Sequence, residues 1–577
     1  MKRIVRNWKR NLFLLAGILT AGVISYWWLR IFLSRYFDPD ELTHLHWAWL
    51  MFKGERPYKD FFYVMVPFFN FLFYPLFLVF GESISVLIFA RVVIFVIYLL
   101  TAGAVFLLGR EIFGKKAGLL AVIIFLSMPM GFAKQMEIRP DNLSVVFFVL
   151  GVWAFFKGFC KAEFKSCKAE FKWFFWSGLF LGANAVVMPK GALSIIALLL
   201  AAVFWVGLFK RREFLKIFGR IFLGMTIPVL ILLIYLLVGG ILIEGLRSII
   251  IFGPLHLEGI WPTSFWWYLK PNDIYYTGYK NFPWYFNLFL LSLALVAVLV
   301  WVGRALRAKK LEKEAMGALS LFLMAIFLIL TLSPLQGTFL QYYLPILPLL
   351  CVLTAGGVLG LLWALRISKN WLGLVICVCF LGACLFSSWQ IYRVRKYWTN
   401  ESHLEHVFNY LKVSKSEDRV FDFWGTFVFR KDGYFVCCEN FPQFTKRLKM
   451  EMPDFIGEMK KNENKFITYD DRREKILGDR VLGLRPEERQ FLRENYVPIG
   501  VELMRVVGRE FNFGEGLMQR AEIFVAGNYR VVGKEIMIDG KRYEPGEVLF
   551  LGKGVHEFGG RGKAIVRYNW EGERKEL

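Results

Sequence analysis

The chain has 577 residues, of which 56% are hydrophobic and 18% aromatic, and its mean hydropathy is positive. A water-soluble protein cannot bury that much apolar surface, whereas a protein embedded in a bilayer exposes it to lipid. The net charge is +24, but most of the excess lies in short loops between apolar segments, which excludes nucleic-acid binding as its explanation. We therefore expect a multi-pass membrane protein whose partners include the bilayer and no nucleic acid.

Apolar segments follow one another as far as residue 390, and most are long enough to cross the hydrocarbon core as a helix. The apolar stretch 61–81 is interpreted as interfacial or re-entrant helices, because a span there would place the basic loops outside. We predict a mainly α fold, with a bundle of about eleven spans near 11–33, 85–109, 117–133, 143–157, 173–189, 191–209, 221–243, 285–303, 318–333, 345–365 and 371–390.

The loops between these spans differ in their basic residues. The N-terminus and the loops on its side hold 25 Lys and Arg, and the loops on the opposite side hold 10. Because basic loops stay in the cytoplasm, we expect a cytoplasmic N-terminus, an uncleaved first span and an extracytoplasmic C-terminal domain at the cell membrane. Outside the cytoplasmic loops and that domain, all eleven acids then lie on the outer side: Asp38, Asp40, Glu41, Glu55, Asp60, Glu82, Glu137, Asp141, Glu244, Glu258 and Asp273.

The composition becomes mixed and charge-rich after the membrane part, which we assign to residues 1–390. A helical pattern at 402–412 and a strand at 419–425 predict an extracytoplasmic α/β domain over 391–520. From residue 521 onward, short alternating segments separated by turn dipeptides predict a small β-rich module over 521–577.

The densest acidic cluster is DPDELTHLHW, at the start of the first outer loop. Asp38 is placed to cap a helix, with Pro39 at its first position and Glu41 three residues after the cap, which predicts a capping box. Asp40 is left without a structural role, and it shares a helix face with His44. Glu41 and His44, on either side of it, are candidates to contact the substrate. A carboxylate there is a candidate general base, and the alternative is a solvated acid in the first turn.

A second outer cluster is KQMEIRPDN, at 134–142, where Pro140 interrupts a helix. Its Glu137 and Asp141 are candidates to bind sugar hydroxyls, and Arg139 is a candidate to bind a lipid phosphate. The alternative is an interfacial cap with a snorkelling arginine. Three further cations on the outer side are candidate phosphate contacts or plain headgroup anchors: Lys59, Arg91 and Lys190.

Cofactor signals are weak throughout the chain. His44 and His46 are two residues apart and therefore face different ways on a helix, which makes a zinc site there a weak hypothesis. We find no CxxC pattern, phosphate-cradling glycine loop or haem motif. The sequence therefore indicates no cofactor and no metal, although a divalent metal would be compatible with it.

Three motifs resemble the GT-C membrane glycosyltransferases, a superfamily that includes protein mannosyltransferases and aminoarabinose transferases. DPDELTHLHWAW with RPYKDFF resembles their first outer loop, MEIRPDNLSVVFF their second-loop turn, and QYYLPILPLL the entry to a late span. The resemblance covers most of residues 1–390. It implies that Asp40 is the catalytic base, and it adds weight to Lys59, Arg139 and Lys190 as phosphate contacts.

The resemblance also implies an inverting transfer of a hexose or pentose from a polyprenyl-phosphate sugar to a glycan, lipid or protein acceptor, often without a metal. Two other classes remain as alternatives. A transporter or flippase of lipid-linked sugars would be favoured by ionisable residues near mid-membrane, and the sequence has none among its acids. A non-enzymatic membrane scaffold would leave the outer acids and cations unexplained.

Overall fold

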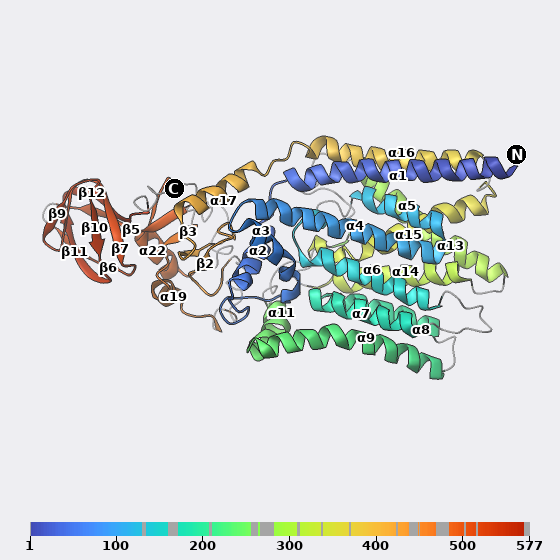
Figure 1. Cartoon of the computed structure of the whole chain (residues 1–577), viewed down its shortest axis with the longest axis horizontal. Helices are drawn as coiled ribbons and strands as arrows, with labels where there is room; N and C mark the ends of the chain where they lie inside the picture. Colours follow the sequence, from blue (N-terminus) through green and yellow to red (C-terminus); the bar gives the residue numbers. More distant parts are fainter. Residues whose placement is uncertain are drawn as a thin grey trace.

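The structure is a computed structural model, and Figure 1 shows a helical bundle at one end and a strand-rich domain at the other. The structure describes residues 2–129, 134–159, 171–206, 211–255, 264–265, 282–308, 312–335, 339–367, 371–422, 425–437, 448, 451–468, 484–500, 504–514 and 517–570. Among the segments outside these ranges are residues 256–263 and 266–281.

Each of the eleven predicted spans coincides with a helix. Among the described residues, eight helices are long and apolar enough to cross a membrane, and α5, α7 and α8 are shorter. The helices of the bundle are α1 (Lys2–Ser34), α4 (Ser85–Phe113), α5 (Lys115–Ser127), α6 (Pro140–Phe159), α7 (Phe171–Val187), α8 (Gly191–Val206), α9 (Arg211–Val238), α13 (Phe282–Ala308), α14 (Lys313–Leu332), α15 (Ile346–Ala364) and α16 (Trp371–Arg395).

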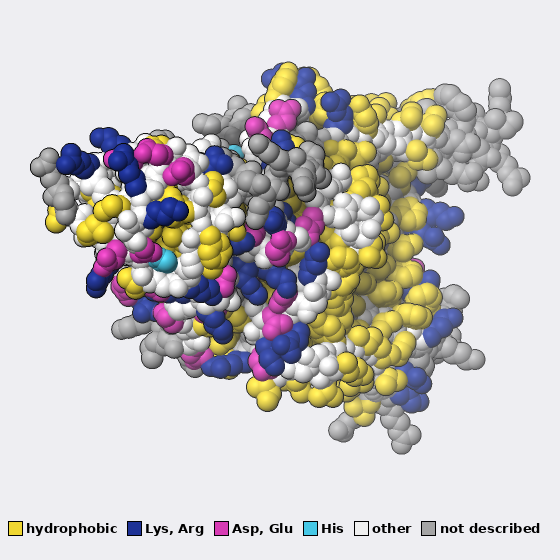
Figure 2. Space-filling view, turned by 60° about the vertical axis from the view of Figure 1, so that its left-hand side comes forward, with side chains coloured by type: hydrophobic (Ala, Val, Ile, Leu, Met, Phe, Trp, Pro, Cys, Tyr) yellow, Lys and Arg dark blue, Asp and Glu magenta, His cyan; other side chains and the backbone are white. Residues whose placement is uncertain are grey.

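The outside of the bundle is apolar, as a lipid-facing surface requires. Figure 2 shows hydrophobic side chains covering the bundle, whereas acidic and basic side chains gather over the strand-rich end. The most apolar 18-residue part of α15 is 83% buried inside the bundle, and that of α9 is only 22% buried. The central helix is therefore covered by its neighbours, and α9 presents most of its surface outward. Figure 1 places the N-terminus at the end of the bundle opposite the strand-rich domain.

The first long loop lies at the end of the bundle that faces the strand-rich domain (Figure 1). It forms α2 (Pro39–Phe52), the 3-10 helix η1 (Pro67–Phe73) and α3 (Tyr74–Phe80). The apolar helical segment formed by η1 and α3 is shorter than the eight long apolar helices, and its interfacial position stays a prediction. Further short helical elements are η3 (Lys134–Met136), α10 (Leu242–Arg247), the π-helical turn η4 (Ser248–Phe252), α11 (Gly253–Leu255) and η5 (Leu340–Tyr343).

The C-terminal domain confirms the predicted helix and the alternating strands. Its helices are α17 (Glu401–Val413), α19 (Phe455–Lys461) and α22 (Pro486–Asn495). Its strands are β1 (Arg419–Phe421), β2 (Lys431–Asp432), β3 (Phe466–Thr468), β4 (Tyr496–Pro498), β5 (Met504–Phe513), β6 (Met518–Ile523), β7 (Gly527–Gly533), β8 (Ile536–Ile538), β9 (Lys541–Tyr543), β10 (Val548–Leu551), β11 (Gly554–Gly560) and β12 (Gly562–Tyr568).

The strands form two sheets. One has the order β10-β7-β12-β5-β3-β1-β2, with β4 paired to β5, and the other has the order β6-β11-β8-β9. Strand β5 pairs with β3 on one side and with β12 on the other. Strands of the α/β part and of the β-rich part therefore belong to one continuous sheet. The domain boundary at 520–521 stays a prediction.

The C-terminal domain is fastened to the first loop by direct contacts. The backbone N–H of Phe62 donates to the carbonyl of Phe435 at 2.7 Å, and Arg430 forms an ion pair with Glu82 at 2.9 Å. Gly425 has a φ of +70°, and a Cβ atom there would lie 2.9 Å from the backbone nitrogen of Thr43 on α2. The C-terminal domain therefore approaches the backbone of α2 at a point where only glycine fits.

We expect Gly425→Ala to loosen this contact, because alanine would both strain the left-handed backbone and press a methyl group against Thr43. Gly540→Ala is the matched control, since Gly540 has a φ of +80° with no atom near its missing Cβ. Gly540→Ala should cost about 1 kcal/mol, and Gly425→Ala about 1–3 kcal/mol more. Thermal unfolding and limited proteolysis of the two variants in detergent would measure the difference. Equal losses of stability in the two variants would show that the contact with Thr43 adjusts to the added methyl group at no cost.

Candidate active site

The N-terminus of α2 is built as the sequence predicts. Asp38 is the N-cap and accepts a hydrogen bond from the backbone N–H of Asp40 at 3.2 Å. Glu41 accepts the backbone N–H of Asp38 at 2.9 Å, which confirms the capping box. The side chain of Asp40 takes no part in the cap and is 51% exposed. The Asp40 carboxylate therefore lies outside the cap, at the positive end of the α2 dipole.

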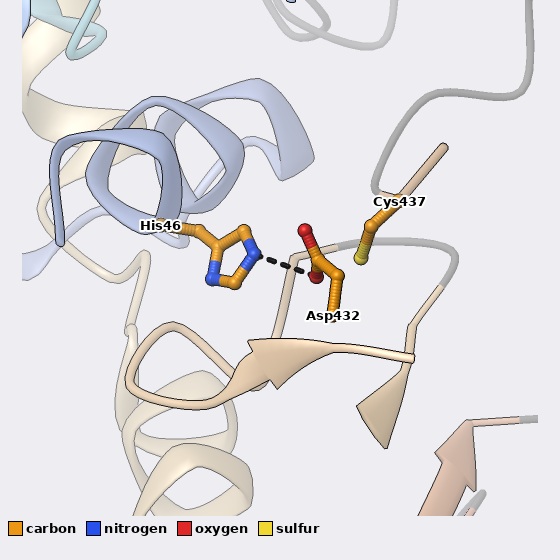
Figure 3. A group of neighbouring side chains, drawn as sticks. All are labelled: His46, Asp432 and Cys437. Carbon is orange, nitrogen blue, oxygen red and sulfur yellow. Dashed lines mark hydrogen bonds and ion pairs between the residues drawn. The ribbon is translucent and has the colours of Figure 1, made fainter. Parts of the chain in front are cut away.

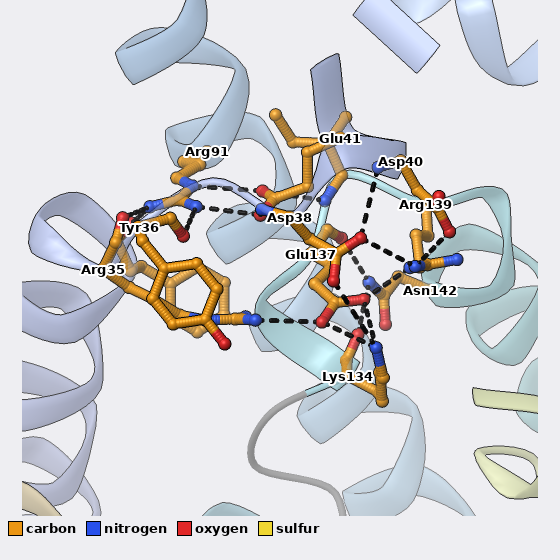
Figure 4. A network of polar contacts seen from close by, with 12 residues as sticks. Arg35, Tyr36, Asp38, Asp40, Glu41, Arg91, Lys134, Glu137, Arg139 and Asn142 are labelled. Atoms are coloured by element: carbon orange, nitrogen blue, oxygen red, sulfur yellow. Dashed lines mark hydrogen bonds and ion pairs between the residues drawn. The ribbon is translucent and has the colours of Figure 1, made fainter. Parts of the chain in front are cut away.

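Glu41 is held inside the protein by Arg91 of α4. The two side chains are fully buried and form a double contact, with Arg91 Nη2 at 2.8 Å and Nε at 3.1 Å from the carboxylate. Arg91 also donates to the backbone carbonyls of Phe32, Arg35 and Tyr36 (Figure 4). Neither side chain is exposed in the structure, and a contact of either residue with substrate stays a prediction. Their role is to hold α2 on the end of the bundle.

Arg139 joins the second outer cluster to the first. Its guanidinium forms ion pairs with Asp40, with Asp38 at 3.2 Å and with Glu137, and only 8% of its side chain is exposed (Figure 4). Burial and the neighbouring carboxylate of Glu137 raise the pKa of Asp38 to about 6, although Arg139 opposes the shift. Arg139 is therefore the cation nearest to the exposed carboxylate of Asp40 among the described residues.

Glu137 lies beneath this pair and is fully buried. It contacts three cations, with Lys134 at 2.9 Å, Arg35 at 3.0 Å and Arg139 beside it. Burial alone would raise the pKa of Glu137, but these three charges together hold it well below its usual range. Glu137 thus balances the charge of buried cations, and its binding of sugar hydroxyls stays a prediction.

Lys190 and Asp141 lie on the next part of the same surface. They line a cavity of about 20 Å³, with room for about one water molecule, together with Tyr342 and residues of α8 and α14. The ammonium of Lys190 lies 3.1 Å from the centre of the Tyr342 ring. Burial lowers the pKa of Lys190 to about 7, with Arg139 adding to this effect and Asp141 opposing it. Lys190 is therefore a second cation within electrostatic range of Arg139.

His44 lies below Asp40 on the inner face of α2. It packs edge-on against Trp47 and Phe69, and its Nδ1 has no hydrogen-bond partner among the described residues. Burial, with the nearby charge of Arg139, lowers the pKa of His44 to about 3. The ring is thus neutral, and a direct contact with substrate remains a prediction.

Lys59 does not join this group. It lines a separate cavity of about 520 Å³, whose other described lining residues come from the first loop, α10, η4 and the C-terminal domain and include none of the Asp40 network. Lys59 and Arg139 therefore lie at different places in the structure, and a phosphate contact of Lys59 stays a prediction. Arg139 contacts Asp40, and Asp141 and Lys190 lie within electrostatic range of Arg139.

Two members of the network were not predicted as site residues. Arg35 follows α1 directly, and Lys134 lies within the KQMEIRPDN motif, so the motif itself was the available signal for Lys134. For Arg35 the sequence offers no signal, because its partner Glu137 is 102 residues away.

Residues 64–237 match the family model described as dolichyl-phosphate-mannose-protein mannosyltransferase. No curated protein matches the sequence.

Two solved structures share the fold. ArnT from Cupriavidus metallidurans, bound to undecaprenyl phosphate, is 13% identical, with a TM-score of 0.57 over 86% of this chain and 97% of ArnT. The oligosaccharyltransferase of Archaeoglobus fulgidus is 12% identical, with a TM-score of 0.51 over 80% of this chain and 70% of that protein. Residues 64–237 therefore resemble a family of membrane mannosyltransferases, and the chain shares the fold of ArnT and of the Archaeoglobus fulgidus oligosaccharyltransferase.

Proposed function

We propose that this protein transfers a sugar, a hexose or a pentose, from a polyprenyl-phosphate donor to an acceptor at the outer face of the cell membrane. The observation that carries the proposal is the exposed carboxylate of Asp40 beside Arg139, at the end of the bundle where the C-terminal domain docks. The undecaprenyl phosphate bound to ArnT, and the dolichol phosphate bound to the Archaeoglobus fulgidus protein AglB, support a lipid donor of the same class.

The reaction would be a single displacement that inverts the anomeric carbon. Asp40 accepts the proton of an acceptor hydroxyl as that oxygen bonds to the anomeric carbon. The bond from that carbon to the phosphate oxygen breaks, and its electron pair leaves with the lipid phosphate. Arg139 and Lys190 would stabilise the second negative charge that develops on this phosphate.

The pairing of Asp40 with Arg139 fits this sequence of events. In the structure the guanidinium is shared among three carboxylates, of Asp38, Asp40 and Glu137. A donor phosphate would compete for Arg139 and draw it away from Asp40. The carboxylate would then be released to accept a proton when the donor is in place.

A transporter or flippase is the second candidate, and purified protein separates the two. Incubation with a polyprenyl-phosphate sugar extract and an acceptor fraction should release free polyprenyl phosphate if the protein is a transferase. A flippase would move the lipid between leaflets of a vesicle without breaking the bond. Intact donor lipid after incubation of folded protein with glycan, lipid and protein acceptor fractions would reject the transferase proposal.

We expect Arg139→Lys and Lys190→Met to weaken donor binding by about 1.5–3 kcal/mol each, because each removes charge-assisted hydrogen bonds to the phosphate. Lys59→Met is the control, since Lys59 lines a different cavity. Binding of a labelled polyprenyl-phosphate sugar in detergent would measure these changes. Loss of affinity only in Lys59→Met would move the phosphate to the large cavity.

Donor affinity should also fall as the pH rises through about 7. The pKa of Lys190 is lowered to about 7, so its ammonium loses its charge above that pH, whereas the phosphodiester of the donor stays anionic. Lys190→Arg keeps the charge throughout this range and should remove the pH dependence. An unchanged pH profile in Lys190→Arg would assign the dependence to another group.

The orientation of the chain is part of the proposal. The N-terminus and the C-terminal domain lie at opposite ends of the bundle (Figure 1), and the basic loops favour a cytoplasmic N-terminus. Reporters fused after residue 115 and after residue 400 should report cytoplasm and exterior respectively. Protection of residues 400–577 from external protease in spheroplasts would reverse the orientation.

A further inference from the structure

The contact between α2 and the C-terminal domain contains a buried group of three side chains with different donor atoms. His46 comes from α2, Asp432 from β2, and Cys437 from the segment that follows β2. Figure 3 shows Asp432 between the other two, with the sulfur of Cys437 directed toward its carboxylate. The nitrogen, oxygen and sulfur atoms all lie within 4.8 Å of one another, and all three residues are more than 90% buried.

The orientation of His46 suits a metal ligand. Its Nδ1 lies 3.0 Å from the carbonyl oxygen of Val428, so Nδ1 carries the proton and donates to that oxygen in the neutral ring. Its Nε2 then has a lone pair directed at Asp432, whose Oδ1 lies 2.9 Å away. A backbone carbonyl that holds the far nitrogen of a histidine is the usual support of a metal-binding imidazole.

Asp432 supplies an unused acceptor at the centre of the group. Its Oδ1 faces His46, and its Oδ2 is buried with no hydrogen-bond partner among the described residues. A buried carboxylate oxygen without a partner carries a large desolvation cost, which a cation would offset. The alternative without a metal is an ion pair between His46 and Asp432, and it leaves Oδ2 unsatisfied.

We propose that His46, Asp432 and Cys437 bind one zinc ion, which fastens α2 to the C-terminal domain. The imidazole, carboxylate and thiolate donors are those of zinc, whereas calcium and magnesium require oxygen ligands. Ligand atoms around zinc lie roughly 3–4 Å apart, because each is about 2.0–2.3 Å from the ion. The three ligand atoms therefore need to move only slightly closer together to hold the ion. The thiol of Cys437 would lose its proton when the metal binds.

The fourth position on the metal would go to water. Asp432 also lines the cavity of about 520 Å³ between the first loop and the C-terminal domain, which offers a route for solvent and for the ion. His46 is less than two helical turns from Asp40 along α2. The metal would thereby fix the helix that carries the exposed carboxylate, without touching the reacting atoms.

Metal content of the full-length protein, purified in detergent without chelator, tests this site. We expect about one zinc per chain, removed by a chelator and regained from zinc chloride with a rise in melting temperature. Cobalt in place of zinc should give a thiolate-to-cobalt charge-transfer band. Less than about 0.1 zinc per chain, with no uptake from zinc chloride, would overturn the proposal whatever the variants do.

Single variants locate the ion. His46→Gln, Asp432→Asn and Cys437→Ser should each lower the zinc content at least about fivefold, and Cys437→Ser should abolish the cobalt band. His556→Gln removes a second histidine–aspartate pair, with Asp539, on the outer β-rich part, and Cys379→Ser removes an exposed cysteine of α16. Both controls should retain full zinc. Zinc content that survives in all three site variants would place the metal elsewhere. Because these assays measure metal rather than sugar transfer, they can fail while the proposed function stands.

Discussion

We expect Asp40→Asn to fold, to bind the lipid donor and to lose at least about 100-fold in transfer rate, the lower end of what a general base contributes. Asparagine has nearly the same size as aspartate but cannot accept the proton of the attacking hydroxyl. The side chain is 51% exposed and takes no part in the capping box, and Arg139 keeps Asp38 and Glu137 as partners when the charge of Asp40 is removed. Transfer from a polyprenyl-phosphate sugar in detergent would measure the loss.

Asp38→Asn is the control for Asp40→Asn, two residues away in the same turn. Asparagine caps a helix about as well as aspartate. The pKa of Asp38 is raised to about 6 by burial and by Glu137, so a neutral side chain at this position costs little near neutral pH. Activity should therefore stay within about tenfold of the wild type. Equal losses in the two variants would show that the cap, rather than proton transfer, limits the rate.

The second large effect is expected for Glu137→Gln, as a loss of stability. Glu137 is fully buried and contacts Arg35, Lys134 and Arg139. Removal of its charge leaves these cations without a full set of counter-charges in a dry environment, which costs about 3–5 kcal/mol. Denaturant unfolding of the purified protein would measure this loss.

Asp60→Asn provides the contrast for Glu137→Gln. Asp60 pairs with Arg56 at 3.0 Å, but both side chains are partly exposed. Solvent screens such a pair, so its loss should cost at most about 1 kcal/mol. Similar losses in Glu137→Gln and Asp60→Asn would mean that water reaches the network around Glu137.

Asp40→Asn and Glu137→Gln act on two different layers of the site. The lower layer contains Glu41, Arg91 and Glu137, whose side chains are buried and whose charges balance within the protein. The upper layer contains Asp40 and Arg139, where a carboxylate reaches the surface beside a cation. We expect changes in the lower layer to act mainly on stability and changes in the upper layer mainly on turnover.

The sequence by itself determined the membrane-embedded class, the positions of the eleven hydrophobic helices, the capping box of α2 and the absence of the Asp40 side chain from that cap. Each of these depends on residues close together in the chain, through hydrophobic length, helix periodicity or capping geometry. The family motifs were equally local, and the match of residues 64–237 to a mannosyltransferase family model and the fold shared with ArnT agree with the resemblance they indicated.

Only the tertiary structure decided which outer cations belong together. Sequence placed Lys59, Arg91, Arg139 and Lys190 on one side of the membrane, but four cations on one side need not meet. In the folded protein Arg91 is buried against Glu41, Lys59 lines another cavity, and Arg139 contacts Asp40.

The sequence also contained no indication that α2 contacts the C-terminal domain through His46 and Asp432. His46 lies 386 residues from Asp432, and no spacing rule connects residues so far apart. Local patterns determine where helices begin and which side chains face the core. The partner of a buried charge is decided by how distant segments pack, because desolvation selects the pairs that can balance one another.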